Sequence, residues 1–254
     1  MSTIFTHFTG EKQAFINPQD FIEQLPDFPK LCVTTFSENI IQKFAGMDGV
    51  KTIASLYSAN GILPVYEITY QGNRIAFFLS RVGAPACAVG LEEIIALGAK
   101  KIVMFGSAGI LDESVVRDKI IIPTSAIRDE GTSYHYLPAD EEIVMDEHSV
   151  NVMVNCLSRL QIPYVLGKTW TLDGIYRETP KAIDARKKQG CISVEMECSA
   201  AIAVTRFRGI PFAQFLYGAD SLAGETWEPN DLTDYGLKGA EKYMTLAIEC
   251  AACL

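Results

Sequence analysis

The chain has 254 residues, a formal net charge of −9 and a hydrophobic fraction of 48%. This length and composition favour one large α/β domain with a sizeable core, although two small domains are also compatible with the length. No run of 18 apolar residues is present, so no membrane-spanning helix is expected. The acidic balance argues against nucleic acid as a partner.

Seven cysteines are scattered along the chain. Their odd number and irregular spacing are typical of reduced thiols in a cytoplasmic protein. Residues 1–10 lack the basic-then-apolar layout of a signal peptide. Cys250 and Cys253 have the spacing of a zinc-binding pair, but they lie in an apolar, alanine-rich segment with no second pair near them in sequence. We therefore expect a cytoplasmic protein without a metal.

The first 29 residues are predicted to form an N-terminal arm, and residues 30–254 the main domain. Prolines at positions 18, 26 and 29 interrupt the arm, which leaves room for a short helix over 18–24. In the first half of the domain, strands are expected over 30–35, 51–57, 63–70, 73–79 and 101–105, and helices over 37–45 and 85–97. The strands on either side of the second helix should run parallel.

Two loops in this half are rich in small residues. One spans 80–85, and the other is Gly106–Gly109, Gly-Ser-Ala-Gly, predicted as the turn after the strand 101–105. Backbone N–H groups in such loops can converge on an anion, although ordinary tight turns use the same residues.

The second half continues the alternation. Strands are expected over 119–128 with a bend at Pro123, over 164–171 and over 211–218; helices are expected over 146–160, 180–189, 198–208 and 232–253. The loop 128–136 is dense in polar and aromatic groups, which suits a substrate wall or a packed surface loop. The loop 173–179 carries Tyr176 and Glu178.

Two carboxylates flank Met196 where a strand-like pattern gives way to an alanine-rich helical one. Such a junction lies at the rim of a sheet, where open α/β folds bind their ligands. A carboxylate such as Glu197 can bind two neighbouring sugar hydroxyls, and a methionine can pack on the sugar's apolar face. Equally, Glu195 and Glu197 could simply begin an amphipathic helix. Asp220, after the strand 211–218, is also expected at the rim.

Several stretches, taken in order, resemble one family. They are Gly83-Ala84-Pro85 with 91–99, then Gly106–Gly109, then Val194-Glu195-Met196-Glu197, and finally Asp220. The resemblance, over about residues 30–254, is to the nucleoside phosphorylases that include hexameric bacterial purine nucleoside phosphorylase, uridine phosphorylase and methylthioadenosine nucleosidase. It implies a single α/β domain with a central mixed, twisted sheet, partly closed into a barrel and flanked by helices. It also implies N-glycosidic bond cleavage by a homo-oligomer, from dimer to hexamer.

The resemblance also implies a sugar site. Glu197 would bind the ribose 2′ and 3′ hydroxyls, Met196 would pack on the ribose, and Glu195 would lie near the ribose or the base. His7 of the arm would reach the ribose 5′-hydroxyl of a neighbouring subunit.

For the base and the phosphate, the implied residues come from other segments. Ile175 and Tyr176 would contact the base, and Gly106 and Ser107 would face the phosphate, which is the co-substrate; no cofactor is implied. Asp220 matters most for substrate choice, because the purine-cleaving members carry an aspartate there. An acid that protonates the leaving purine needs a pKa raised by burial, since the ordinary value of about 3.9 is too low.

The sequence departs from the family at the phosphate. Members that bind phosphate have Gly-Asp-Pro-x-Arg after the first strand, where residues 34–37 here are Thr-Thr-Phe-Ser, and an arginine where this chain has Met104. Arg81 is the candidate replacement, with Arg128 and Arg177 as further cations. The nucleosidases, which use water, also lack the second of these arginines.

We therefore expect a nucleoside phosphorylase, a pentosyltransferase that transfers ribose from a purine to phosphate through an oxocarbenium-like transition state. The alternatives are a uridine phosphorylase, a nucleoside hydrolase of the same fold, and a non-catalytic nucleoside-binding protein.

Overall fold

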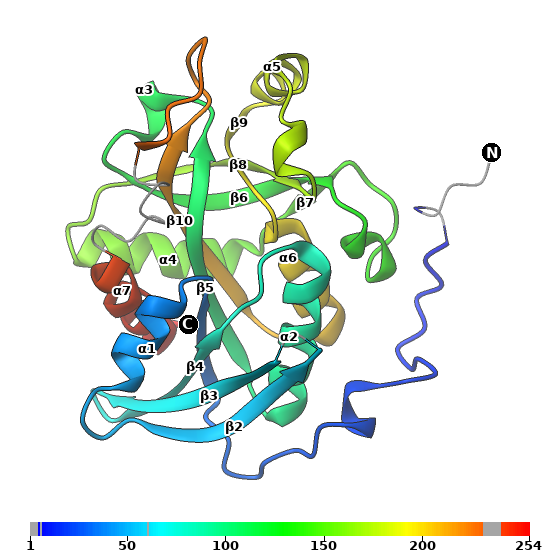
Figure 1. Ribbon diagram of the computed structural model, residues 1–254, viewed down its shortest axis with the longest axis vertical. Coiled ribbons are helices and arrows are strands. Elements are labelled where there is room, and N and C mark those ends of the chain that lie inside the picture. Colours follow the sequence, from blue (N-terminus) through cyan, green and yellow to red (C-terminus); the bar gives the residue numbers. More distant parts are fainter. Residues whose placement is uncertain (1–4, 6, 60, 231–239) are drawn as a thin grey trace.

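The computed structural model describes residues 5, 7–59, 61–230 and 240–254, and it shows one mixed sheet of ten strands with helices packed around it (Figure 1). The strands are β1 (Leu31–Thr35), β2 (Lys51–Ser58), β3 (Gly61–Tyr70), β4 (Asn73–Leu79), β5 (Lys101–Ile110), β6 (Ile120–Asp129), β7 (Glu142–Val144), β8 (Tyr164–Leu172), β9 (Cys191–Glu195) and β10 (Phe212–Ser221). The helices are α1 (Glu38–Ala45), α2 (Ala84–Leu97), α3 (Glu113–Val116), α4 (Glu147–Arg159), α5 (Pro180–Lys188), α6 (Cys198–Arg208) and α7 (Ala240–Cys253), with short 3-10 helices η2 (Pro18–Asp20), η3 (Thr132–His135) and η4 (Ile175–Arg177).

Five strands close into a barrel. Their order is β10–β6–β8–β9–β5, and the ring closes because β5 pairs with both β9 and β10. The sheet continues from β5 through β1, β4 and β3 to β2. β5 therefore belongs to both parts, since it also pairs in parallel with β1. This arrangement confirms the predicted fold class, a mixed sheet partly closed into a barrel and flanked by helices.

The two faces of the sheet bury separate parts of the core. In β5, Val103 and Phe105 pack in a cluster with residues of α1, α4 and α7, whereas Ile102 and Met104 pack in a second cluster with α2 and α6. This alternation is the period of two that a strand buried on both faces shows. Met104, at a position where phosphate-binding relatives of the resemblance have an arginine, is thus a fully buried core residue.

The Gly-Ser-Ala-Gly stretch is not a turn, and that prediction is wrong. Residues Gly106–Gly109 continue β5, where Gly106 is opposite Leu216 of β10 and Gly109 is opposite Val194 of β9. The glycines are needed for close packing. A Cβ on Gly106 would lie 2.9 Å from the Phe36 ring, and one on Gly109 would lie 2.6 Å from Leu222 and 2.9 Å from Val194.

Of four further secondary-structure predictions, two are confirmed, one is wrong and one lies partly outside the described residues. The strands β4 and β5 are parallel, as predicted, although β1 lies between them. The bend at Pro123 is confirmed by a register shift in the pairing of β6 with β8. The helix predicted over 18–24 is wrong: only the 3-10 turn Pro18–Asp20 forms. Part of the helix predicted over 232–253 lies outside the described residues, and the rest is α7.

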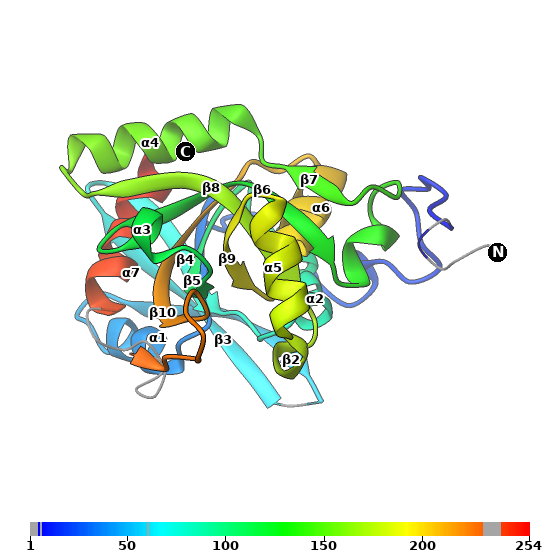
Figure 2. The ribbon, with the colours of Figure 1, turned by 90° about the horizontal axis from the view of Figure 1, so that it is seen from above.

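The arm runs along the outside of the domain on the side of α2 and β7 (Figures 1 and 2). The Leu25 N–H donates to the Leu97 carbonyl at the end of α2, at 3.0 Å. Further out, Phe5 packs against Tyr134 of η3 and Phe8 against Phe207 of α6. The division into arm and domain stays a prediction. Across the described ranges, every helix is too short or too polar to cross a bilayer.

Candidate active site

A cavity of about 190 Å³ opens where the end of β5, the β9–α6 junction and the end of β10 meet. Its lining consists of Phe36, Val82, Ser107, Ala108, Gly109, Ile175, Glu178, Val194, Glu195, Met196, Glu197 and Asp220. The closed barrel brings these strand ends together, although β5 ends at Ile110, β9 at Glu195 and β10 at Ser221. The cavity therefore gathers small residues, apolar side chains and four carboxyl groups at one rim of the sheet.

Glu197 is 6% exposed and lies at the N-terminus of α6. Its Oε1 accepts a hydrogen bond of 2.6 Å from the Gly83 N–H. Gly83 has a φ of +94°, a left-handed conformation that glycine tolerates readily. Burial, and next the charge of Glu195, raise the pKa of Glu197 to about 8. Hydrogen-bond donors that approach this carboxyl group would therefore favour its ionised form.

The Glu195 carboxylate accepts three hydrogen bonds. Its Oε2 accepts from the backbone N–H groups of Glu197 at 2.8 Å and Cys198 at 2.6 Å, and its Oε1 accepts from the Thr171 hydroxyl at 2.6 Å. It therefore satisfies the first amides of α6, as a carboxylate at a helix start does. Burial nevertheless raises its pKa to about 7 against these hydrogen bonds. Glu195 is thus the last residue of β9 and caps α6 without belonging to it, and the helix is buried from Cys198 to Thr205 and not amphipathic, so the helix-start alternative is only partly correct. Glu195 also lines the cavity.

Asp220 and Glu178 form a second pair of acids. Asp220 is 9% exposed and follows a bulge in β10 between Gly218 and Asp220, a feature that redirects a strand's side chains. Its Oδ2 accepts from the Trp227 indole N–H at 2.8 Å. Burial raises the Asp220 pKa, and the Trp227 hydrogen bond opposes that rise. Burial, and next the charge of Asp220, raise the pKa of Glu178 to about 7.

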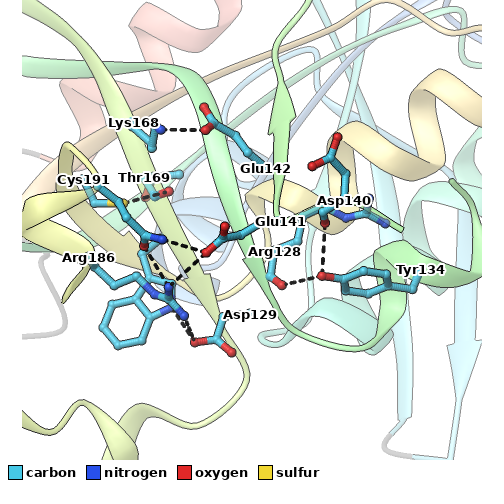
Figure 3. A network of polar contacts seen from close by, with 12 residues as sticks. Arg128, Asp129, Tyr134, Asp140, Glu141, Glu142, Lys168, Thr169, Arg186 and Cys191 are labelled. Carbon is cyan, nitrogen blue, oxygen red and sulfur yellow. Dashed lines mark hydrogen bonds and ion pairs between the residues drawn. The ribbon is translucent and has the colours of Figure 1, made fainter. Parts of the chain in front are cut away.

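The loop that carries Ile175 and Glu178 leads into α5, whose Arg186 contacts the barrel strand β6 (Figure 3). Arg186 of α5 donates to Asp129 of β6 at 2.9 Å, and Gln189 donates to Glu141 at 2.6 Å. The Arg186 guanidinium also lies 5.4 Å from the centre of the Trp170 ring. These contacts fix α5, and with it the preceding loop, against β6 and β8.

Six of the predicted site residues line this cavity: Ser107, Ile175, Glu195, Met196, Glu197 and Asp220. Four do not. Gly106 is buried beneath Phe36, Tyr176 is 95% exposed, and Arg81 precedes the lining residue Val82. His7 is exposed on the arm, among residues that contact η3 and α6 of the same chain.

No lysine, arginine or histidine is among the lining residues that the structure describes. The Arg81 Nη2 is buried without a hydrogen-bond partner, and the charge of Arg81 acts on Glu93 of α2. The Arg128 guanidinium is already hydrogen-bonded, since it donates to the Ser133 hydroxyl and the Pro138 carbonyl at 2.8 and 2.7 Å. Its backbone carbonyl accepts from the Tyr134 hydroxyl (Figure 3). Arg177 is exposed.

Sequence reasoning missed the contributions of Glu178, Trp227, Phe36 and Val82. Glu178 lies in a loop singled out from the sequence, but only the structure shows its proximity to Asp220. Nothing in the pattern of residues 222–230 marks Trp227.

The family model described as "Phosphorylase superfamily" matches residues 30–252. A purine nucleoside phosphorylase of DeoD type 2 from Vibrio cholerae is 26% identical over 242 residues, which cover 92% of this chain and 95% of that protein. A uridine phosphorylase from Treponema pallidum is 23% identical over 202 residues, covering 74% and 77%. Among solved structures, a uridine phosphorylase from Vibrio fischeri superposes with a TM-score of 0.74 at 21% identity, covering 93% and 98%.

The chain therefore belongs to the phosphorylase superfamily. The predicted resemblance is confirmed, and so is the expected enzyme class, since the relatives are named as nucleoside phosphorylases, which are pentosyltransferases.

Proposed function

We propose that this protein cleaves the N-glycosidic bond of a purine nucleoside with phosphate as the acceptor, giving free base and ribose 1-phosphate. The observation that carries the proposal is the gathering of Glu197, Met196 and Asp220 in one buried cavity. The relative named purine nucleoside phosphorylase supports the choice of a purine. The proposed reaction takes place in the cytoplasm and uses no cofactor.

The sugar-side pair, Glu195 and Glu197, is proposed to bind the ribose. The Gly83 N–H occupies one acceptor position of Glu197. A carboxylate has about four such positions, so Glu197 can still accept from the 2′ and 3′ hydroxyls. Met196 supplies an apolar surface for the ring, and His7 of a neighbouring subunit is proposed to contact the 5′-hydroxyl in a homo-oligomer.

The base-side pair, Glu178 and Asp220, is proposed to face the leaving base, with Ile175 and Tyr176 beside it. As the C1′–N bond breaks, its electron pair moves to the base and positive charge develops on the ribose. The ionised Glu197 stabilises that charge. A hydrogen bond or a proton from the base-side pair stabilises the departing purine. An oxygen of phosphate then forms the new bond to C1′.

Phosphate is proposed to lie against the Gly106–Ser107 segment and Arg81. The buried Nη2 of Arg81 has no acceptor, and a guanidinium is well suited to a phosphate oxygen. One observation favours a second candidate, a nucleoside hydrolase: the described lining carries four carboxyl groups and no cation. A water nucleophile carries no charge, whereas a phosphate anion is stabilised by a nearby cation.

A panel of purine and pyrimidine nucleosides, assayed with and without phosphate for release of free base, tests both candidates. The proposal predicts phosphate-dependent release from purine nucleosides with ribose 1-phosphate as the second product. Release of free ribose at the same rate without phosphate would establish the hydrolase. A preference for uridine over every purine would overturn the purine assignment, and binding without turnover would indicate a non-catalytic nucleoside-binding protein.

A further inference from the structure

The two acids of the base-side pair have unequal surroundings. Asp220 accepts a hydrogen bond from the Trp227 indole at 2.8 Å. Glu178 has no hydrogen bond to any described residue, although it is half-buried in the same cavity and close enough to feel the charge of Asp220. One carboxyl group thus has a donor, and its neighbour has none.

The difference in hydrogen bonding determines which of the two carboxyl groups is protonated. Two neighbouring carboxyl groups in a desolvated cavity do not both ionise readily, so one of them keeps its proton near neutral pH. A donor such as the Trp227 N–H favours the ionised form of its acceptor, whereas a buried carboxyl group without a donor favours the neutral form. Both effects assign the negative charge to Asp220 and the proton to Glu178.

Most of the other charged groups near Glu178 are acids. Glu195 at the end of β9 and Glu197 at the start of α6 line the same cavity, and both are acids. In its own loop, Asp173 is a further acid, and the neighbouring Arg177 is exposed to solvent. The pKa of Glu178, raised to about 7 by burial and by Asp220, agrees with the geometric assignment.

We propose that Glu178 is the catalytic acid that protonates the leaving base, and that Asp220 is its ionised partner, positioned by Trp227. This inference rests on the proposed function. In the step, the Glu178 O–H bond breaks and its proton goes to a ring nitrogen or carbonyl oxygen of the purine. The electron pair of the C1′–N bond moves onto the base, and the acceptor oxygen bonds to C1′. Glu178 leaves the step as a carboxylate and regains its proton from solvent after the base departs.

The test compares Glu178→Gln with Asp220→Asn on guanosine and on 7-methylguanosine, near pH 6, where Glu178 is protonated. A base that is already cationic needs no proton in order to leave. Glu178→Gln should therefore lose about 10²-fold in turnover of guanosine and much less on 7-methylguanosine, in line with general-acid contributions. Asp220→Asn should show a smaller preference for loss on guanosine than Glu178→Gln does, because Glu178 can still donate its proton although its pKa falls. Exposed Glu147 provides a matched control, since Glu147→Gln changes a carboxyl to an amide outside the cavity.

The pH dependence gives a second readout. In the wild type, kcat/KM for guanosine should fall above about pH 7 as Glu178 loses its proton, and this descending limb should vanish in Glu178→Gln. A loss selective for guanosine in Asp220→Asn, with an unselective or absent loss in Glu178→Gln, would overturn the inference and return the acid role to Asp220.

A measurement without turnover separates this inference from the proposed function. In protein labelled with ¹³C at the glutamate carboxyl groups, the resonance that is missing from Glu178→Gln should titrate near pH 7 in the wild type, and its midpoint should fall in Asp220→Asn because the neighbouring charge is gone. The absence of any glutamate that responds to Asp220 would overturn the inference even if the enzyme cleaves purine nucleosides. A wild type that releases no base from any nucleoside would instead overturn the proposed function.

Discussion

The sugar-side pair and the base-side pair each contain two acids that line the same cavity, but the chain holds them in different ways. Glu195 and Glu197 lie two residues apart, and their oxygens accept from backbone N–H groups and from Thr171. Glu178 and Asp220 come from distant segments, and one side-chain donor, Trp227, serves the pair. Glu195 accepts from backbone N–H groups of its own junction and Glu197 from the backbone N–H of Gly83, whereas Asp220 depends on an indole side chain in a separate loop. The sugar-side pair is therefore suited to fixed binding, and the base-side pair to the exchange of a proton.

The most damaging change should be on the sugar side. Glu197→Gln removes the charge that stabilises the developing ribose cation and weakens the acceptor for its hydroxyls. We expect kcat/KM for the best nucleoside to fall by about 10²–10³-fold, as for loss of one electrostatic contact to the transition state. Steady-state kinetics measure the loss, and circular dichroism confirms the fold. A variant with nearly wild-type turnover would refute the assignment of Glu197 to the ribose.

The raised pKa of Glu197, about 8, predicts pH-dependent binding. Ribose hydroxyls donate to the carboxylate, so nucleoside binding favours the ionised form and releases a proton. Affinity should improve as pH rises and level off above about pH 8, with roughly tenfold weaker binding for each unit below that value. Calorimetry in buffers of different ionisation enthalpy measures both quantities. Glu197→Gln should bind weakly at every pH, and an unchanged pH dependence in that variant would assign the proton to another group.

Arg81→Ala tests the anion site next to both pairs. We expect the KM for phosphate to rise about tenfold, corresponding to the loss of one charge-assisted hydrogen bond, while the KM for nucleoside changes little. Arg117→Ala is the matched control, because Arg117 is exposed and pairs only with Glu113 on α3 among the contacts described. Unchanged phosphate kinetics in Arg81→Ala would contradict the assignment of Arg81 to phosphate and favour the hydrolase candidate.

Trp227→Phe should have the smallest effect, because it removes a hydrogen bond and leaves both acids in place. Without the indole donor, the Asp220 pKa should rise, so Asp220 competes with Glu178 for the proton. We expect a loss of a few-fold to about tenfold in guanosine turnover, the equivalent of about 1 kcal/mol, with a change in the descending pH limb. Because Trp227 is 56% exposed, the melting temperature should change little. A lowered melting temperature with an unaltered pH profile would show a purely structural role.

The same contrast explains what could be predicted from the sequence. The Glu-Met-Glu junction is contiguous and lies between a strand-like and a helix-like pattern, so its residues and their place at the sheet rim could be predicted. The hydrogen bond from the Gly83 N–H to Glu197 could not, because the two residues are 114 positions apart in sequence. The alternation of Val103 and Met104 between two core faces follows from strand geometry. In contrast, the meeting of Glu178 with Asp220 depends on closure of the barrel, which no local pattern encodes. The strand position of Gly106 and Gly109 could not be predicted, because glycine occurs equally in tight turns and in closely packed strands.

The most direct test of the account is a crystal structure with a purine nucleoside and sulfate in place of phosphate. The account predicts that both ribose hydroxyls, 2′ and 3′, lie within hydrogen-bonding distance of Glu197, with the base against Glu178 and Asp220. A nucleoside bound with its base toward Glu197, or outside the cavity formed by β5, β9 and β10, would contradict it.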